Sequence, residues 1–484
     1  MHPRHRLDEA WQKAGLRSQR CLDCDVCCRF ASPAAHFIPF FSASEIAALG
    51  ETARSRFLCP GRSPGERALA EPHGHGYRCP FLEPAARHCT VYGQRPLDCR
   101  LYPLVLMYDE PGTAVWLGAD EVCPFAFESP ARPEWQEAVE EAARLLDGPL
   151  ADAVAAAPGL VSPFQDHIRL LRPLPEITRR VCRSGLGLGR LAATSRRGLE
   201  DFFRARPSCL TGHAFPAMYL WTDLFNLHWK VEADCLLVLA ESDGVSFLMA
   251  PPLGEGDFGR ALEAARELMA AINGPRGGAR AQEVDEELLP RFLAAGWHVG
   301  HRATEYIAST EALASLRGRH FDGRRHDLRL FARRHQAAWR PYEAADLPQC
   351  VALLRRWQAE RARRHPDAFY RDQLEATGFL HLRTLREAEE LGLRGRVVVV
   401  GGQVAAYTFG FPLADGQTFA DFIEVADLGL QGLPAFVFHE FCREALAYPF
   451  LNLGTDSELP SLAQAKLLYR PCRLVPSYIL NAPQ

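Results

Sequence analysis

The last third of the chain carries a regular pattern of apolar runs and polar breaks. Apolar segments 396–400 and 403–411 are separated only by Gly401-Gly402, which predicts a β-hairpin with a two-residue turn. The runs that follow predict strand 417–426, helix 434–446, strand 450–454, helix 459–469 and strand 473–480. This order of hairpin, strand, helix, strand, helix, strand indicates a mixed α+β or α/β fold.

A less regular alternation fills the middle of the chain. Its apolar pattern predicts a strand pair at 229–242 and 245–251, helices at 257–274 and 285–297, and a strand at 298–309. Segment 133–148 begins with Pro and ends with Gly, as helices often do, whereas 149–175 is rich in Ala and Pro and is interpreted as a linker. We therefore predict an N-terminal domain at 1–150, a linker at 151–174, and two lobes at 175–340 and 341–484.

Cysteines give the N-terminal domain its chemistry. Nine of the 15 cysteines fall in the first 123 residues. Eight of these recur in short motifs: Cys21, Cys24, Cys27, Cys28, Cys79, Cys89, Cys99 and Cys123. Thiolates so close together repel one another unless a cation or a disulfide takes up their charge. The cysteines therefore predict a metal or redox module.

Metal is the favoured interpretation over disulfides. The first residues are polar and charged, unlike a secretory signal, and no apolar run of 18 or more residues occurs, so we expect a cytoplasmic, reduced protein without a transmembrane helix. Separated C-x2-C pairs are typical of zinc, whereas three cysteines at consecutive x2 spacings are closer to an iron–sulfur cluster run. The metal can be zinc or iron, in two four-cysteine sites or in one site with spare thiols, and His73, His75 and His88 are further candidate ligands.

The cysteine motifs resemble a known family. C-x2-C-x2-CC, followed by CPFL, C-x-VY and RPxxCRxYP, is similar to the CxxCxxCC (YkgJ-type) family of zinc- or iron-chelating domains over about residues 18–125. The resemblance implies a bound metal and does not define a reaction.

The order of elements in the last third is that of an acetyltransferase-like (GNAT) core. In that fold the phosphates of the acyl donor lie at the N-terminus of the helix that follows the fourth strand. The corresponding loop, DLGLQGLP at 427–434, offers Gly429 and Gly432 but lacks the Gln/Arg-x-x-Gly-x-Gly/Ala pattern that grips coenzyme A. This difference argues against a plain acetyl-CoA enzyme.

A second resemblance covers about residues 172–484. Segments 215–225, 305–331 and 452–480 are similar in order to motifs of the phosphatidylglycerol lysyltransferase C-terminal-like family. The family implies a tandem, double GNAT-like module and an aminoacyl or acyl transferase related to enzymes that use aminoacyl-tRNA. The chain lacks the membrane half of the lipid lysyltransferases, and it has Arg324-Arg325-His326 where Lys-Arg-Asn is usual.

Candidate site residues follow from these motifs. Lys466, one of only three lysines, can stabilise a donor phosphate or an oxyanion, Asp456 can position an amine, and Glu424 is a candidate base. Stretch 317–340 holds eight arginines in a chain of net charge −4, and Arg324 and Arg325 are candidates for binding the phosphates of a donor.

The sequence as a whole predicts a small cysteine-rich metal-binding domain followed by a tandem double GNAT-like acyltransferase module. The module is expected to transfer an aminoacyl or acyl group to an amine or hydroxyl, with aminoacyl-tRNA favoured over acetyl-CoA as the donor. The other interpretation is a non-enzymatic, metal-dependent binding or redox-sensing protein whose transferase-like part binds RNA or protein. The degenerate glycine loop favours this second interpretation, and Asp456 and Lys466 favour the enzyme.

Overall fold

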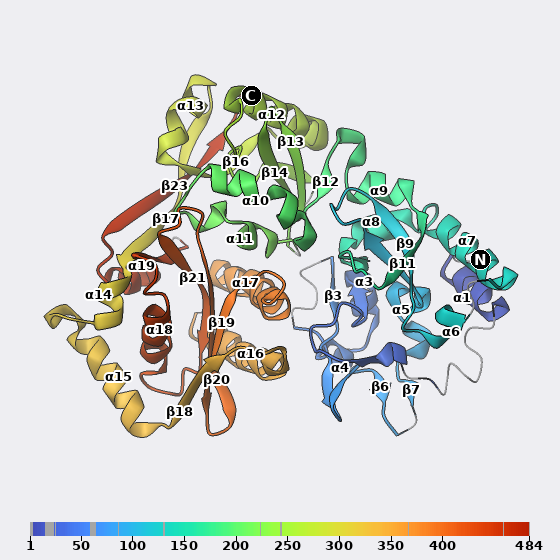
Figure 1. Cartoon of the computed structure of the whole chain (residues 1–484), viewed down its shortest axis with the longest axis horizontal. Coiled ribbons are helices and arrows are strands. Elements are labelled where there is room, and N and C mark those ends of the chain that lie inside the picture. Colours follow the sequence, from blue (N-terminus) through green and yellow to red (C-terminus); the bar gives the residue numbers. More distant parts are fainter. Residues whose placement is uncertain are drawn as a thin grey trace. The chain divides into compact units, whose positions relative to one another are not determined.

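The chain forms two compact units, Met1–Ser195 and Arg196–Gln484 (Figure 1). The structure is a computed structural model, which describes residues 3–14, 24, 26–58, 64–85, 87–128, 131–222, 224–242, 244–365, 367–457 and 459–483. Helices and sheets occur in both units, which confirms the predicted mixed class.

The first unit is built on a sheet with strand order β10-β8-β9-β11. Its strands are β8 (Leu104–Tyr108), β9 (Val115–Asp120), β10 (Val161–Ser162) and β11 (Ile168–Pro173). The helices of this unit are α1 (Pro3–Lys13), α3 (Ala43–Ala48), α4 (Glu51–Arg54), α5 (Leu97–Leu101), α6 (Pro124–Glu128), α7 (Pro133–Leu146), α8 (Ala151–Ala156) and α9 (Pro175–Val181). Apolar side chains of β8 and β9 form one core with Trp11 of α1 and Trp135 of α7, whose ring centroids are 5.9 Å apart.

Short strands surround the cysteine motifs. They are β1 (Arg29–Phe30), β2 (Phe40–Ser42), β3 (Gly65–Arg67), β4 (Glu71–His73), β5 (Gly76–Arg78), β6 (Leu82–Glu83) and β7 (His88–Cys89). Hydrogen bonds from distant backbone groups tie this region together: Leu97 N donates to Glu45 (2.9 Å) and Phe40 N donates to Asp98 (2.8 Å). These contacts fix α5, which carries Cys99, against β2 and α3.

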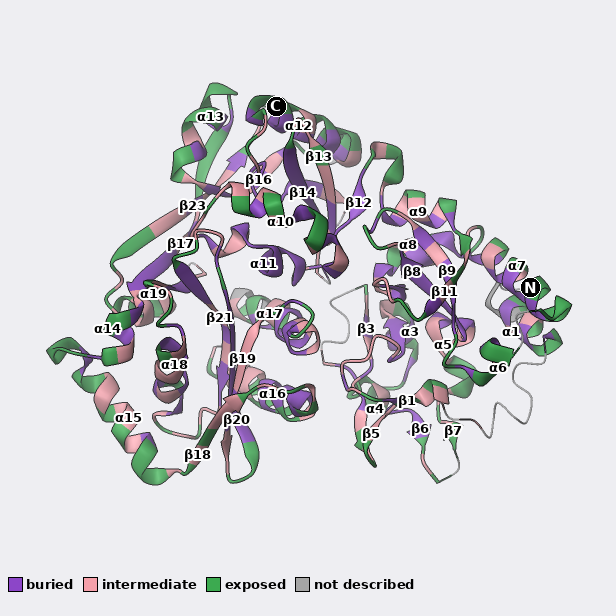
Figure 2. Cartoon of the chain, viewed as in Figure 1, coloured by how far each residue is buried: buried purple, intermediate pink, exposed green. Residues whose placement is uncertain are grey.

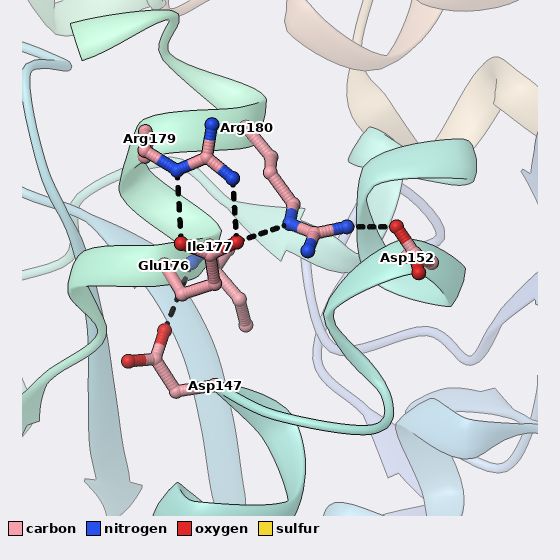
Figure 3. A network of polar contacts seen from close by, with 6 residues as sticks. All are labelled: Asp147, Asp152, Glu176, Ile177, Arg179 and Arg180. Atoms are coloured by element: carbon pink, nitrogen blue, oxygen red, sulfur yellow. Dashed lines mark hydrogen bonds and ion pairs between the residues drawn. The ribbon is translucent and has the colours of Figure 1, made fainter. Parts of the chain in front are cut away.

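Residues 151–174 are not a linker but part of the first unit, in contrast to the sequence-based prediction. This segment forms α8, β10 and β11, and its apolar side chains are buried in the core of the unit. Polar contacts also fasten the start of α9: Ile177 N donates to Asp147 (2.8 Å), and Arg180 bridges Glu176 (2.7 Å) and Asp152 (Figure 3). The Ala-rich composition was misleading because small side chains also suit tightly packed helices.

A fragment that ends at residue 150 is therefore expected to be less stable than one that ends at Ser195. The shorter fragment loses β10 and β11, which flank β8 and β9, together with buried Leu160, Val161 and Ile177. Each fully buried side chain of this kind contributes roughly 1.5–3 kcal/mol. Thermal unfolding of the two metal-loaded fragments checks this. Equal melting temperatures would support the predicted end of the N-terminal domain at residue 150.

The second unit contains one continuous sheet with helices on both faces (Figure 1). Its strand order is β13-β14-β15-β16-β23-β17-β22-β21-β20-β19-β18. The strands are β13 (Asn226–Glu232), β14 (Cys235–Ser242), β15 (Val245–Leu248), β16 (Arg280–Asp285), β17 (His298–Ser309), β18 (Ala337–Pro341), β19 (Arg394–Val400), β20 (Gln403–Pro412), β21 (Thr418–Ala426), β22 (Phe450–Thr455) and β23 (Arg473–Asn481). The helices are α10 (Arg196–Ala205), α11 (Phe215–Tyr219), α12 (Phe258–Asn273), α13 (Leu289–Ala294), α14 (Thr310–Ser315), α15 (Asp322–Arg334), α16 (Leu347–Arg364), α17 (Ala368–Glu387), α18 (Leu433–Glu444) and α19 (Pro460–Leu467).

The second unit repeats one order of elements twice. The first copy consists of hairpin β13-β14, β15, α12, β16, α13 and β17. The second copy consists, in the same order, of hairpin β19-β20, β21, α18, β22, α19 and β23. The last strands are exchanged, since β17 pairs with β22 and β23 pairs with both β16 and β17. This is the predicted double GNAT-like arrangement, and the exchange joins the two lobes in one sheet.

Most predicted elements of the second unit lie within a few residues of the observed ones. The hairpin turn at Gly401-Gly402 is confirmed, with φ values of +59° and +77° that favour glycine. The prediction of a single strand at 229–242 is wrong, because Ala233 and Asp234 adopt left-handed conformations and turn the chain between β13 and β14. Buried residues are concentrated on the central strands (Figure 2).

Candidate functional site

One cavity in the first unit collects the cysteine motifs. It has a volume of about 200 Å³ and is lined by seven of the eight predicted metal cysteines: Cys24, Cys27, Cys28, Cys79, Cys89, Cys99 and Cys123. Cys21 lies outside the described residues. His88 also lines this cavity, as does His36, which the sequence did not single out, whereas His73 and His75 are not among its lining residues.

The thiols of this cavity differ in exposure: Cys79 and Cys123 are buried, whereas Cys27 is exposed. The Sγ atoms of Cys27 and Cys28 are 4.0 Å apart, and Cys79 N donates to Cys28 O (2.8 Å). Burial raises the pKa of Cys79 to about 12 and raises the pKa of Cys99 well above its usual value, with smaller contributions from neighbouring thiols. The pKa of Cys27 is raised by its contact with Cys28 and by burial. Such thiols ionise readily only when a cation shares the site.

The donor set fits a soft or borderline metal. Thiolates and imidazoles are the ligands that zinc and iron–sulfur centres prefer, and the cavity offers both. In the described part of the chain, no three His, Cys, Asp or Glu side chains stand at ion-binding distances. Tyr102, which donates to Asp120 (3.0 Å), and Asp98 also face this cavity.

In the second unit, β21 and β22 run parallel for only three residue pairs and then separate. The last pair is Ala420 with Asn452. A bulge in β21, shown by a register shift opposite Phe409 and Gly410, changes the alternation of side chains at this point. Asp421 and Glu424 both lie close to Cys442 of α18 as a result. The separating strands therefore place two carboxyl groups on the same side of the sheet.

These two carboxyl groups have raised pKa values. Burial raises the pKa of Asp421 to about 6, while Lys466 and a hydrogen bond from Thr408 (3.3 Å) act in the opposite direction. The pKa of Glu424 is raised further, by burial and by the charge of Asp421. Asp421, which the sequence analysis did not single out, is therefore better suited than Glu424 to be an ionised base near neutral pH.

Lys466 and Asp456, both predicted from the sequence, meet around Tyr306. The Tyr306 hydroxyl donates to Asp456 (2.8 Å), and Lys466 Nζ lies 6.0 Å from the centroid of the Tyr306 ring. Lys466 Nζ donates to the Leu453 carbonyl. Burial lowers the pKa of Lys466 to about 8, against the opposing effects of Asp421, Glu305 and Asp456. The lysine is half-buried on α19 and thus stays within reach of a substrate.

The two predicted phosphate-binding arginines have different surroundings. The Cζ of Arg324 lies 4.8 Å from the centroid of the Tyr469 ring, which itself packs on Phe438 beside α19. Arg325 donates to the carbonyls of Leu316 and Gly318, the latter at 2.9 Å, and so fastens the end of α14. Arg324 therefore borders the Lys466 site, whereas Arg325 stabilises a turn.

The glycine loop before α18 is partly exposed, with Gly429 exposed and Gly432 half-buried. The N–H of Gly429 already donates to Asp427 (2.9 Å). A Cβ atom on Gly432 would lie 2.4 Å from the Asp327 carbonyl of α15, and its φ is +87°, so this position requires glycine. A role of Gly429 and Gly432 in binding a donor phosphate stays a prediction.

Fold and sites together define a cysteine-rich domain joined to a tandem GNAT-like transferase module. The chain belongs to the family described as "Phosphatidylglycerol lysyltransferase, C-terminal", whose model matches residues 207–481. A second model, described as "Putative zinc- or iron-chelating domain", matches residues 20–124. Both resemblances inferred from the sequence are confirmed.

A solved structure shares the fold of the second unit, and another is a weaker match. A conserved protein of unknown function from Bacteroides thetaiotaomicron is 20% identical with a TM-score of 0.54, and the match covers 61% of this chain and 99% of that one. L-PGS from Bacillus licheniformis is 12% identical with a TM-score of 0.43, over 60% of this chain and 91% of that one. No curated protein matches the chain significantly. Among the described residues, no helix is long and apolar enough to cross a membrane.

Proposed function

We propose that the second unit transfers an aminoacyl group from aminoacyl-tRNA to an amine or hydroxyl acceptor, beside Lys466 at the point where β21 and β22 separate. The observation that carries this proposal is the group of Lys466, Asp456 and Tyr306 beside Asp421. Family membership supports transferase chemistry. The glycine loop at 427–434, which lacks the coenzyme A pattern, and the basic helix α15 favour a tRNA-borne donor over acetyl-CoA.

The side chains of Asp421 and Lys466 suit attack by an amine on the ester of the donor. Asp421 accepts the proton of the attacking amine, and the Lys466 ammonium stabilises the oxyanion that forms on the carbonyl carbon. The oxyanion then collapses, the carbon–oxygen ester bond breaks, and the ribose hydroxyl leaves with the proton. Carboxyl groups outnumber the single lysine here, so the site attracts a cationic amine. That amine loses one proton to water before it attacks and gives the second to Asp421 as the new bond forms, and this second proton passes to the leaving ribose oxygen.

Activity is expected to depend on pH as a bell-shaped curve. It rises as Asp421 loses its proton, through a pKa of about 6, and falls as Lys466 loses its proton, through a pKa of about 8. Asp421→Asn should remove the acidic limb and lower kcat by roughly 10²-fold, within the range for a general base. Rates of transfer measured from pH 5 to 9 test this, and an unchanged acidic limb in Asp421→Asn would assign the base elsewhere.

Arg324 and Arg325 are expected to respond differently to alanine substitution. Arg324→Ala should weaken tRNA binding. It should also reduce the magnitude of the slope of log affinity against log salt concentration by about 1, the change expected when one phosphate contact is lost. Arg325→Ala should instead lower the melting temperature, since it removes the donor to the Leu316 and Gly318 carbonyls. Filter binding at several salt concentrations together with thermal unfolding separates the two, and an unchanged slope in Arg324→Ala would remove this residue from the donor site.

For the first unit we propose that the cysteine cavity binds a metal, which is either zinc or iron, and that iron can be present as an iron–sulfur cluster. The proposal is supported by seven thiols on one cavity and by the zinc- or iron-chelating family. One cavity favours one shared centre over two separate four-cysteine sites. Metal analysis with an absorption spectrum of anaerobically purified protein tests it, because zinc is colourless and iron–sulfur clusters are not.

A non-enzymatic, metal-dependent binding or redox-sensing role is the second candidate. The observation that favours it is the glycine loop at 427–434, which lacks the coenzyme A pattern. Binding of tRNA without transfer of its aminoacyl group would support this second candidate and contradict the first.

A further inference from the structure

A buried polar pair, Glu305 and Asn452, lies directly behind the Lys466 site. We propose that Glu305 and Asn452 are positioning residues, which hold β22 in the conformation that presents the Leu453 carbonyl to the Lys466 ammonium. The inference rests on the proposed role of Lys466 in transfer. It concerns residues of β17 and β22 that the catalytic steps above do not use.

Asn452 shapes the backbone of β22. Its side chain is fully buried; Nδ2 donates to the Cys209 carbonyl (2.7 Å) and to Glu305, and Oδ1 accepts from Gly454 N (2.7 Å). The register between β17 and β22 shifts at this point, since Glu305 pairs with Thr455 and Ile307 pairs with Asn452. The extra residue makes a bulge at positions 453 and 454.

The bulge directs a carbonyl group toward the lysine. Gly454 has a φ of +73°, a left-handed conformation that glycine adopts without a steric penalty. A Cβ atom at this position would lie 3.4 Å from Lys466 Nζ, so the lysine passes directly over the bulge. The Leu453 carbonyl accepts a hydrogen bond from that ammonium group. The Asn452 contact with Gly454 thus fixes the geometry of the Lys466 contact.

Glu305 holds Asn452 in place. It is buried and accepts hydrogen bonds from Thr211 N (3.0 Å) and Thr211 Oγ1 (3.2 Å) as well as from Asn452. The charged groups that face it are Glu283, which pairs with Arg302, and Lys466. A buried carboxyl group is costly unless it is fully hydrogen-bonded, and this one also adds negative charge near Lys466.

The reactivity of Lys466 toward acetic anhydride tests this inference without relying on transfer activity. The chain has three lysines, so peptide mass spectrometry reports Lys13 and Lys230 as internal controls. In the unaltered protein, Lys466 should react with a pH midpoint of about 8. Glu305→Gln and Asn452→Ala should lower this midpoint, because Lys466 loses a nearby charge or its carbonyl partner, and should lower kcat by about 10²-fold without changing the KM for the donor.

Thr211→Val is a milder variant, since it removes only the hydroxyl donor to Glu305. It allows the Lys466 midpoint to be measured in a folded protein if the other variants unfold. It should shift the midpoint in the same direction by a smaller amount. A lower kcat with an unchanged Lys466 midpoint would mean a general structural role and would overturn the inference. A shifted midpoint with unchanged kcat would support the positioning and instead contradict the proposed role of Lys466 in transfer.

Discussion

Lys466→Ala is expected to lower the rate of aminoacyl transfer by about 10²–10³-fold, the range measured when a single oxyanion-stabilising donor is removed. Lys466 supplies the cationic group among Asp421, Asp456 and Glu305, and its ammonium is already fixed by the Leu453 carbonyl. Alanine removes this charge and leaves the neighbouring carboxyl groups without their counter-charge. Binding of tRNA should change little, because α15 is untouched.

Two further variants make the Lys466 result specific. Lys466→Met keeps most of the length of the side chain without its charge, and it should be as inactive as Lys466→Ala. Lys230→Ala removes a lysine that pairs with Glu232 on β13 (3.1 Å), away from Lys466, and this variant should remain active. Activity is measured as single-turnover transfer. Full activity of Lys466→Ala would exclude this residue from the mechanism.

Replacing Cys79 and Cys99 together by serine is expected to remove the metal and to unfold the region around the cavity. The two thiols come from separate parts of the first unit, β5–β6 and α5, and a metal ion would link them. Binding of a structural metal can contribute on the order of 10 kcal/mol to the folding of its domain. The second unit should keep its own melting transition.

Cys182→Ser is the matched control for the metal experiment. Cys182 is fully buried in the first unit but does not line the cavity, so its substitution should leave the metal content unchanged. Metal content is measured by elemental analysis, and unfolding by calorimetry. A Cys79→Ser/Cys99→Ser protein with full metal content would place the metal elsewhere.

The sequence predicted the parts of the structure that depend on local signals. The turn at Gly401-Gly402 and the helix at 434–446 were predictable, since short apolar runs with Gly and Pro at their ends specify them. That Lys466 and Asp456 lie near one another was predictable, because they share one short motif. Cys24, Cys27 and Cys28 were predictable as a group because their close spacing limits how far the thiols can separate, whereas the distant cysteines were assigned to the same site from their short motifs and the family resemblance.

The residues that were missed depend on long-range pairing. Glu305 reaches Asn452 only because the last strands of the two lobes are exchanged, and the sequence carries no local sign of that exchange. Asp421 joins Glu424 through a bulge, which strict strand alternation does not predict. Arg325 looked like a phosphate ligand, but the carbonyl groups at the end of α14 already bind it.

Transfer from two labelled donors tests the central claim most directly. The purified protein is given tRNA charged with a labelled amino acid or, in parallel, labelled acetyl-CoA, together with a primary amine acceptor, and the label on the acceptor is measured. The group of Lys466, Asp456 and Asp421, together with a glycine loop that lacks the coenzyme A pattern, predicts transfer from the charged tRNA and little from acetyl-CoA. Efficient transfer from acetyl-CoA, or binding of charged tRNA without any transfer, would contradict the proposed function.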